Sequence, residues 1–149
     1  MKSMPLIIEL QLLTMFFLFM LAISQTMMYS GKFYHCYTEH LPGFNGWRTR
    51  QLIDTKFDCL NYGGEWIRPD LNFDNLSDSF ETLVSIASGE GWTSVLWATT
   101  DAYIVDYEPK RDHRPYFGPV YTIIIQFIIS LLFLNLFIGV VVESFNRQK

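Results

Sequence analysis

Two long apolar runs constrain this chain more than any other feature of its sequence. From Pro5 to Tyr29 only Glu9 is charged, and no residue between Tyr116 and Val142 carries a charge. A helix needs about 20 consecutive apolar residues to cross the hydrocarbon core of a bilayer. Both runs exceed that length, so we predict two membrane-spanning helices rather than a pair of buried core helices.

The first run also invites comparison with a secretory signal peptide, because it follows Met1 and Lys2 directly. The run is longer than the usual apolar region of such a peptide. The residues around its end, ISQTMMYSG (23–31), contain no clean small-x-small cleavage site. A signal anchor or a true span is therefore the favoured interpretation.

The two cysteines, Cys36 and Cys59, lie in the polar connection between the apolar runs. An even number of cysteines in an extracytoplasmic segment favours a disulfide. Lysine and arginine residues flank both ends of the two runs, so their distribution does not decide the orientation. The cysteines favour the orientation in which the connection faces the oxidising side of the membrane.

Between Arg68 and Lys110 the chain contains acidic residues but no lysine or arginine. The eight acids of this acid-only window are Asp70, Asp74, Asp78, Glu81, Glu90, Asp101, Asp106 and Glu108. Such a charge distribution concentrates cations and repels polyanions. We therefore expect no nucleic-acid partner, while a merely solvated acidic face remains an alternative for the window as a whole.

Two short helical patterns lie inside this window, on either side of the sequence SGEGW (88–92). Asp74 or Asn75 can cap the first helix, which we prefer to glycosylation of Asn75. One face of that helix is predicted from apolar residues at helical spacing, namely Phe80, Leu83, Val84 and Ala87. Each helix has about 10–14 residues, which is too few to cross a bilayer but suits a re-entrant segment.

Glu90 is the one acid that stands between two glycines in the middle of this segment. A buried carboxylate without a partner is costly, so Glu90 must reach water or hold a cation. Non-helical backbone at membrane depth is tolerated only where it lines water or is buried in protein. We therefore place Glu90 at the bend of a re-entrant hairpin, where a permeating cation would meet it.

The order of these elements resembles the pore module of voltage-gated calcium and sodium channels, and most closely a third repeat. Four stretches carry the resemblance, in the expected order and spacing: GKFYHC (31–36), NFDN (72–75), EGW (90–92) and FLNLFIGVVVESFN (133–146). Together they make the resemblance cover nearly the whole chain.

The resemblance implies an all-α membrane protein in which two transmembrane helices flank a re-entrant helix–filter–helix pore loop, with a disulfide-closed extracellular loop. The module would consist of an outer helix over 4–29, an extracellular loop over 30–73, pore helices and selectivity filter over 74–101, a second extracellular loop over 102–115 and an inner helix over 116–146.

The resemblance also assigns residues of the turn to the selectivity filter. Glu90 would supply a carboxylate to the ion, and Ser88 and Gly89 would supply backbone carbonyls. Gly91 and Trp92 would support the filter. Third repeats of sodium channels carry lysine where this chain has Glu90, so the repeat is similar to a calcium-type one, although Gly89 replaces a bulkier residue.

Elsewhere in the module, the resemblance implies a gate region and a covalent bond. Asn135, Ile138 and Val142 would form the gate region of the inner helix. Cys36 and Cys59 would form the extracellular disulfide.

The resemblance implies a protein that is not an enzyme and has no resident cofactor, with Ca²⁺ or Na⁺ as the permeating ion. Its partners would be three equivalent pore modules, preceding voltage-sensor helices and the lipid bilayer. We expect a multi-pass protein of the plasma membrane, with the ciliary membrane as a further option. The rival interpretation is a two-span accessory or adhesion protein whose disulfide-closed loop binds a partner.

Overall fold

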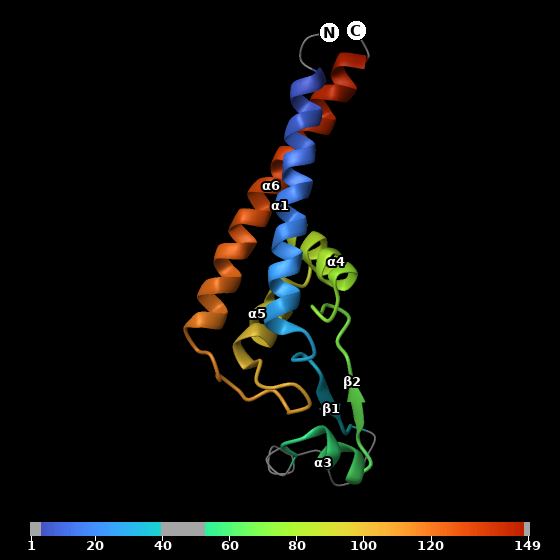
Figure 1. Ribbon diagram of the computed structural model, residues 1–149, viewed down its shortest axis with the longest axis vertical. Helices are drawn as coiled ribbons and strands as arrows, with labels where there is room; N and C mark the ends of the chain where they lie inside the picture. The colour runs from blue at the N-terminus through green and yellow to red at the C-terminus, as the bar shows by residue number, and fades with distance from the viewer. Residues whose placement is uncertain (1–3, 40–52, 148–149) are drawn as a thin grey trace.

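Two long helices run beside each other along most of the length of the molecule (Figure 1). The computed structural model describes residues 4–39 and 53–147, so residues 40–52 of the predicted extracellular loop lie outside the described residues. Helix α1 spans Met4–Tyr29 and helix α6 spans Phe117–Arg147. The start of α1 and the end of α6 lie at the same end of the molecule.

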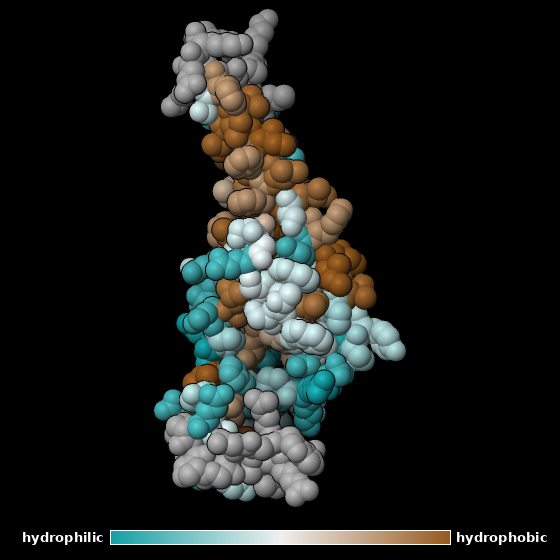
Figure 2. Space-filling model, turned by 180° about the vertical axis from the view of Figure 1, so that it is seen from behind, coloured by the Kyte–Doolittle hydropathy of each residue, from teal (hydrophilic) through white to brown (hydrophobic). Residues whose placement is uncertain are grey.

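Both helices are long and apolar enough to cross a membrane. Many of their large side chains point away from the protein: Phe16 is 57% exposed and Phe127 is 67% exposed. A core helix of a soluble protein would bury such groups. In Figure 2 hydrophobic residues dominate the end of the molecule formed by the α1–α6 pair, while hydrophilic residues gather toward the other end. These features support the two predicted spans.

Two short helices, α4 (Leu76–Ala87) and α5 (Trp92–Asp101), pack against the long ones. Helix α4 contacts both α1 and α6, whereas α5 contacts α6. Asn75 caps α4, because its side-chain oxygen accepts a hydrogen bond of 2.9 Å from the backbone N–H of Asp78.

The buried face of α4 is rotated from the predicted one, although Leu83 is buried as predicted and Phe80 and Ala87 pack, partly buried, against the core. The buried residues are Ser79, Thr82, Leu83 and Ile86. Val84, predicted to face the core, is instead 40% exposed. The rotation is possible because the buried hydroxyls have partners: Ser79 Oγ lies 2.6 Å from Thr26 Oγ1 on α1, and Thr82 Oγ1 donates to the Asn72 carbonyl at 2.8 Å. Hydrogen-bonded polar groups can occupy core positions at little cost.

An aromatic cluster fixes the place where α1 ends and the chain later enters α4. Phe73 from the NFDN stretch is 1% exposed and lies with its ring centroid 5.5 Å from that of Phe33. Tyr29, the last residue of α1, contacts both rings. Asp74 adds a polar link, since its side chain accepts a hydrogen bond of 2.9 Å from the backbone N–H of Gly31. The entry to α4 is thereby tied to the end of the first span.

The segment 30–73 was expected to be loop, and the structure corrects this expectation. The described part contains two short strands and a short helix, namely β1 (His35–Tyr37), α3 (Lys56–Asn61) and β2 (Glu65–Ile67). The strands pair antiparallel, with Cys36 opposite Trp66. A disulfide joins Cys36 on β1 to Cys59 on α3, as predicted. We call this unit the disulfide knob; because it contains a sheet, the fold is mostly helical rather than all-α.

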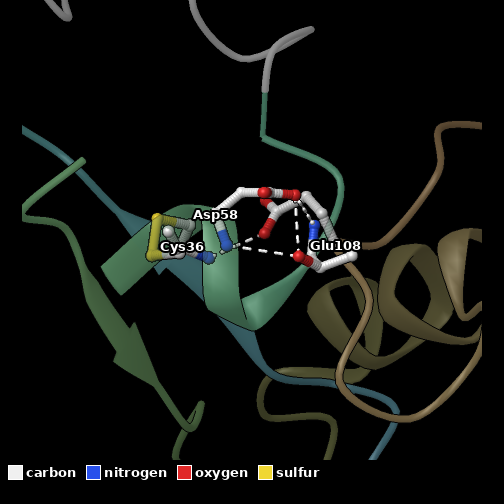
Figure 3. The surroundings of a disulfide bond; sticks show 5 residues. Cys36, Asp58 and Glu108 are labelled. Carbon is white, nitrogen blue, oxygen red and sulfur yellow. Dashed lines mark hydrogen bonds between the residues drawn. A yellow bond between two sulfur atoms is a disulfide. The ribbon is translucent and has the colours of Figure 1, made fainter. Parts of the chain in front are cut away.

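The connection between α5 and α6 docks onto the disulfide knob (Figure 3). Glu108 Oε2 accepts a hydrogen bond of 2.8 Å from the backbone N–H of Cys36. Two backbone hydrogen bonds continue the contact, from Glu108 to the Asp54 carbonyl at 3.0 Å and from Lys56 to the Asp106 carbonyl at 2.9 Å. The knob is therefore coupled to the segment that leads into the second span.

Candidate functional site

Helix α4 ends in a turn that requires a glycine. The backbone N–H of Gly89 donates to the Ile86 carbonyl at 3.0 Å, and that of Glu90 donates to the Ser85 carbonyl at 3.1 Å. This pair of bonds defines a Schellman motif, in which Gly89 takes the left-handed position with φ of +87°. A side chain there would meet nothing within 4 Å. The backbone conformation, and not a lack of space, therefore explains the glycine at position 89.

A second glycine with positive φ, Gly91 at +68°, begins the next helix. A side chain at this position would collide with that of Leu71. The Gly91 carbonyl accepts hydrogen bonds from the backbone N–H groups of Ser94 and Val95 at 3.1 and 3.2 Å. Two residues with left-handed backbone thus flank Glu90 in the turn between α4 and α5.

Glu90 lies exposed on this turn. Among the residues that the structure describes, its carboxylate makes no hydrogen bond or ion pair, and the carbonyl oxygens of Ser88 and Gly89 accept no hydrogen bond. Helix α4 ends at Ala87 with no basic residue in its last turn, so its negative dipole end favours a cation near the turn.

Other acids of the acid-only window have structural contacts instead. Five of the eight accept hydrogen bonds or form ion pairs: Asp74, Asp78, Asp101, Asp106 and Glu108. Of the remaining three, Asp70 and Glu81 lie before or within α4, and only Glu90 lies in the turn. The window is therefore not a uniform cation-attracting surface, and Glu90 is its distinctive member.

The acid on α3 also has a structural contact. Asp58 and Thr55 form a capping box: Asp58 Oδ2 accepts from the Thr55 N–H at 3.0 Å and from its hydroxyl at 2.7 Å. The hydrogen bond from the Thr55 hydroxyl lowers the pKa of the Asp58 carboxyl. Asp58 is thus held ionised within the disulfide knob.

Two polar contacts that the sequence did not predict attach α4 and α5 to α6. Gln126 on α6 donates from Nε2 to the Ile86 carbonyl at 2.7 Å. Thr99 Oγ1 on α5 lies 2.7 Å from Thr122 Oγ1 on α6, and both residues are buried. The available signal was the presence of Thr122 and Gln126 in a charge-free span, because such polar side chains must find partners.

Trp92, the predicted filter support, is the first residue of α5 and is 37% exposed. Within this module it is therefore only partly covered. No group of three or more histidine, cysteine or acidic side chains within the described ranges is arranged to hold a metal ion.

The predicted gate residues lie farther along α6 than the residues around the turn. They border a groove of about 140 Å³ between α1 and α6, which is lined by Leu10, Gln11, Asn135, Ile138, Gly139 and Val142. Asn135 is nine residues beyond Gln126, which corresponds to about 13 Å along a helix axis. The structure brings Asn135, Ile138 and Val142 together, at a distance along α6 from the contacts that hold the turn.

The whole chain, residues 1–149, matches a family model described as "Ion transport protein". It is 33% identical over 133 residues to the human voltage-dependent T-type calcium channel subunit alpha-1I, which covers 89% of this chain and 6% of the relative. It is 32% identical over 157 residues to the Danio rerio sodium channel protein type 4 subunit alpha A, in a match that covers 99% of this chain and 8% of the relative. It is 31% identical over 154 residues to sodium channel protein 1 brain of Heterololigo bleekeri, in a match that covers 100% of this chain and 10% of the relative. The chain thus spans at most about a tenth of the length of these relatives.

Proposed function

Because the chain belongs to the ion transport protein family, we propose that it is a pore-forming segment of a voltage-gated cation channel, with Glu90 in its selectivity filter. One observation carries this proposal: the turn between α4 and α5 presents a carboxylate and two backbone carbonyls that the module itself does not use. The family match favours this function over an accessory or adhesion protein.

We propose that α4, the turn and α5 form a re-entrant pore loop. The two helices have 12 and 10 residues, too few to cross a bilayer. Both pack against membrane-spanning candidates rather than standing apart from them. Irregular backbone at membrane depth requires burial in protein or contact with water, because its polar groups need hydrogen-bond partners. The turn at Gly89 meets part of this requirement, since its backbone N–H group is hydrogen-bonded to the Ile86 carbonyl.

Oxygen ligands of this kind suit calcium, which takes carboxylate and carbonyl oxygens at about 2.3–2.6 Å. At a separation of about 5 Å, a unit charge gains roughly 1–3 kcal/mol from one carboxylate as the effective dielectric falls from 80 to 20. A divalent ion gains about twice as much, before its larger dehydration cost is counted. We therefore propose that Glu90 favours calcium over monovalent cations.

A single module cannot enclose a pore. The proposal therefore requires three further equivalent modules, from the same chain or from other subunits. Exposed apolar groups on α5 support such an assembly, since Trp92 is 37% exposed and Trp97 is 60% exposed. We propose that Trp92 packs against a neighbouring module and thereby supports the filter together with Gly91. We further propose that the two spans cross the plasma membrane or the ciliary membrane.

We propose that Asn135, Ile138 and Val142 form the gate region. The three residues share one helical face at spacings of three and four. Replacing Val142 with asparagine should increase closed-state leak current, because a polar side chain wets a hydrophobic constriction. An unchanged leak with normal surface expression would contradict this assignment.

The function is tested by reversing the charge at position 90 in the complete channel. Glu90→Lys should shift the bi-ionic reversal potential toward lower relative calcium permeability, because an attraction is replaced by a repulsion. The matched control is Glu81→Lys, an exposed acid on α4 that lies outside the turn. Asp101 is a poorer control because its side chain accepts a hydrogen bond of 2.8 Å from the Asp112 N–H. Equal shifts in both variants would overturn the proposal.

A further inference from the structure

Gln126 connects the inner helix directly to the base of the turn that carries Glu90. It lies on α6, and its side-chain Nε2 donates a hydrogen bond of 2.7 Å to the carbonyl oxygen of Ile86. The same nitrogen lies 3.3 Å from Ser130 Oγ, one helical turn farther along α6. The shorter contact is the one that crosses between two elements.

The Ile86 carbonyl is part of the hydrogen-bond pair that closes the turn. It accepts from the Gly89 N–H at 3.0 Å, beside the bond from Glu90 to Ser85. A carbonyl oxygen has two lone pairs, so Gly89 and Gln126 together use its capacity. Ile86 also belongs to the last turn of α4, whose carbonyls lack the usual partners within the helix. Gln126 therefore supplies a second donor to a carbonyl that the turn itself bonds through Gly89.

An amide side chain such as that of Gln126 is costly in an apolar span, and the contact with Ile86 offsets part of this cost. An amide in an apolar span must find hydrogen-bond partners, because hydrocarbon offers none. Within the described residues, the other amide atom of Gln126, Oε1, is buried without a partner. An apolar side chain would avoid that unpaired oxygen. The donor half of the amide is the part that makes a contact of consequence for the turn.

We propose that Gln126 is a positioning residue for the selectivity filter, acting through Ile86 and Gly89 on the place of Glu90. This inference rests on the function proposed above for Glu90. Helix α6 also carries the proposed gate residues. The first of them, Asn135, lies about 13 Å beyond Gln126 along the helix axis. A displacement of α6 is therefore transmitted to the base of the filter turn through this hydrogen bond.

The test compares two substitutions of Gln126 in the complete channel. Gln126→Met keeps the length and removes the donor; Gln126→Asn keeps the amide but shortens its reach by one methylene. The control is Ser130→Ala, which removes the other partner of Gln126 and leaves the contact with Ile86. The readout is the concentration of Ca²⁺ that half-blocks the monovalent current, which a loss of folding or surface expression does not change.

Both Gln126 variants should raise the half-blocking concentration by about two- to tenfold, the range expected for one lost hydrogen bond. Ser130→Ala should leave it within twofold of the unaltered channel. A Gln126 variant that reaches the surface and shows wild-type calcium block would overturn the proposed role of Gln126. If Glu90→Lys still shifts permeability in the same experiments, the proposed function of Glu90 stands. Failure of Glu90→Lys to shift permeability would overturn the proposed function instead. If only Gln126→Asn reaches the surface, its half-blocking concentration decides the outcome.

Discussion

The carboxylate of Glu108 accepts a hydrogen bond of 2.8 Å from the backbone N–H of Cys36, so the connection between α5 and α6 is attached to a residue that forms the disulfide. The two residues are 72 positions apart in the chain. This contact makes the disulfide knob and the segment that leads into α6 a connected unit, and its strength can be measured.

Glu108→Ala should accelerate reduction of the Cys36–Cys59 disulfide by a phosphine reductant about two- to tenfold, because local opening becomes easier when this hydrogen bond is lost. Glu108→Gln keeps an acceptor oxygen and should have a smaller effect. Glu65→Ala, an exposed acid on the same knob, is the control. Identical reduction rates for the alanine variants of Glu108 and Glu65 would show that the contact does not hold the loop.

Gly89 should tolerate substitution according to how readily each side chain adopts a left-handed backbone. Gly89→Ala forces an L-residue to a φ near +87°, at a cost of about 1–2 kcal/mol, whereas asparagine adopts this region more easily. We therefore expect calcium selectivity to fall in the order glycine, asparagine, alanine. Ser88→Ala is the control, because Ser88 has a φ of −75°. Selectivity in Gly89→Ala equal to that in Ser88→Ala would contradict the need for a left-handed residue at position 89.

The pair Thr99 and Thr122 should show an asymmetric response to removal of each hydroxyl. Thr99 Oγ1 also bonds the Leu96 carbonyl at 2.9 Å, so Thr122 is the donor within the pair. Thr99→Val leaves a buried Thr122 hydroxyl without this partner and should destabilise by about 1–3 kcal/mol, more than Thr122→Val does. The double valine variant should recover part of the loss, since both hydroxyls are then absent.

The measurement for this pair is the thermal unfolding midpoint of the detergent-solubilised channel, followed by size-exclusion chromatography. Thr93→Val, at an exposed position on the same helix, serves as the control. Additive losses in the double variant would mean that the two hydroxyls do not interact.

The two spans and the cap at Asn75 could be predicted from the sequence because each depends on local composition. The orientation of α4 could not, since it depends on a hydroxyl of Thr26 that lies 53 residues before Ser79. Apolar spacing alone ranked Val84 above Ser79 as a core residue. The three-residue strands of the knob are too short to produce a periodic pattern.

Within the candidate site, Glu90 was recognisable because a carboxylate buried in an apolar segment is costly unless it reaches water or holds a cation, and the structure leaves Glu90 exposed. The role of Gly89 followed only from its φ and its hydrogen bond to Ile86. Gln126 was not identified because its partner is a backbone carbonyl, which leaves no mark on the identity of residue 86. Contacts between a side chain and distant backbone are the part of this site that one sequence does not reveal.

The most direct test of the central claim, that Glu90 binds the permeating ion, is calcium block of the monovalent current in the complete channel carrying Glu90→Gln. This change removes the charge and nearly preserves the shape. The half-blocking calcium concentration should rise at least about tenfold, because a divalent ion loses its attraction to one nearby carboxylate. The same change at Glu81 should leave the value within about twofold, since exposed charges away from the ion path are screened by water and salt. A half-blocking concentration that is the same in both variants would contradict the account.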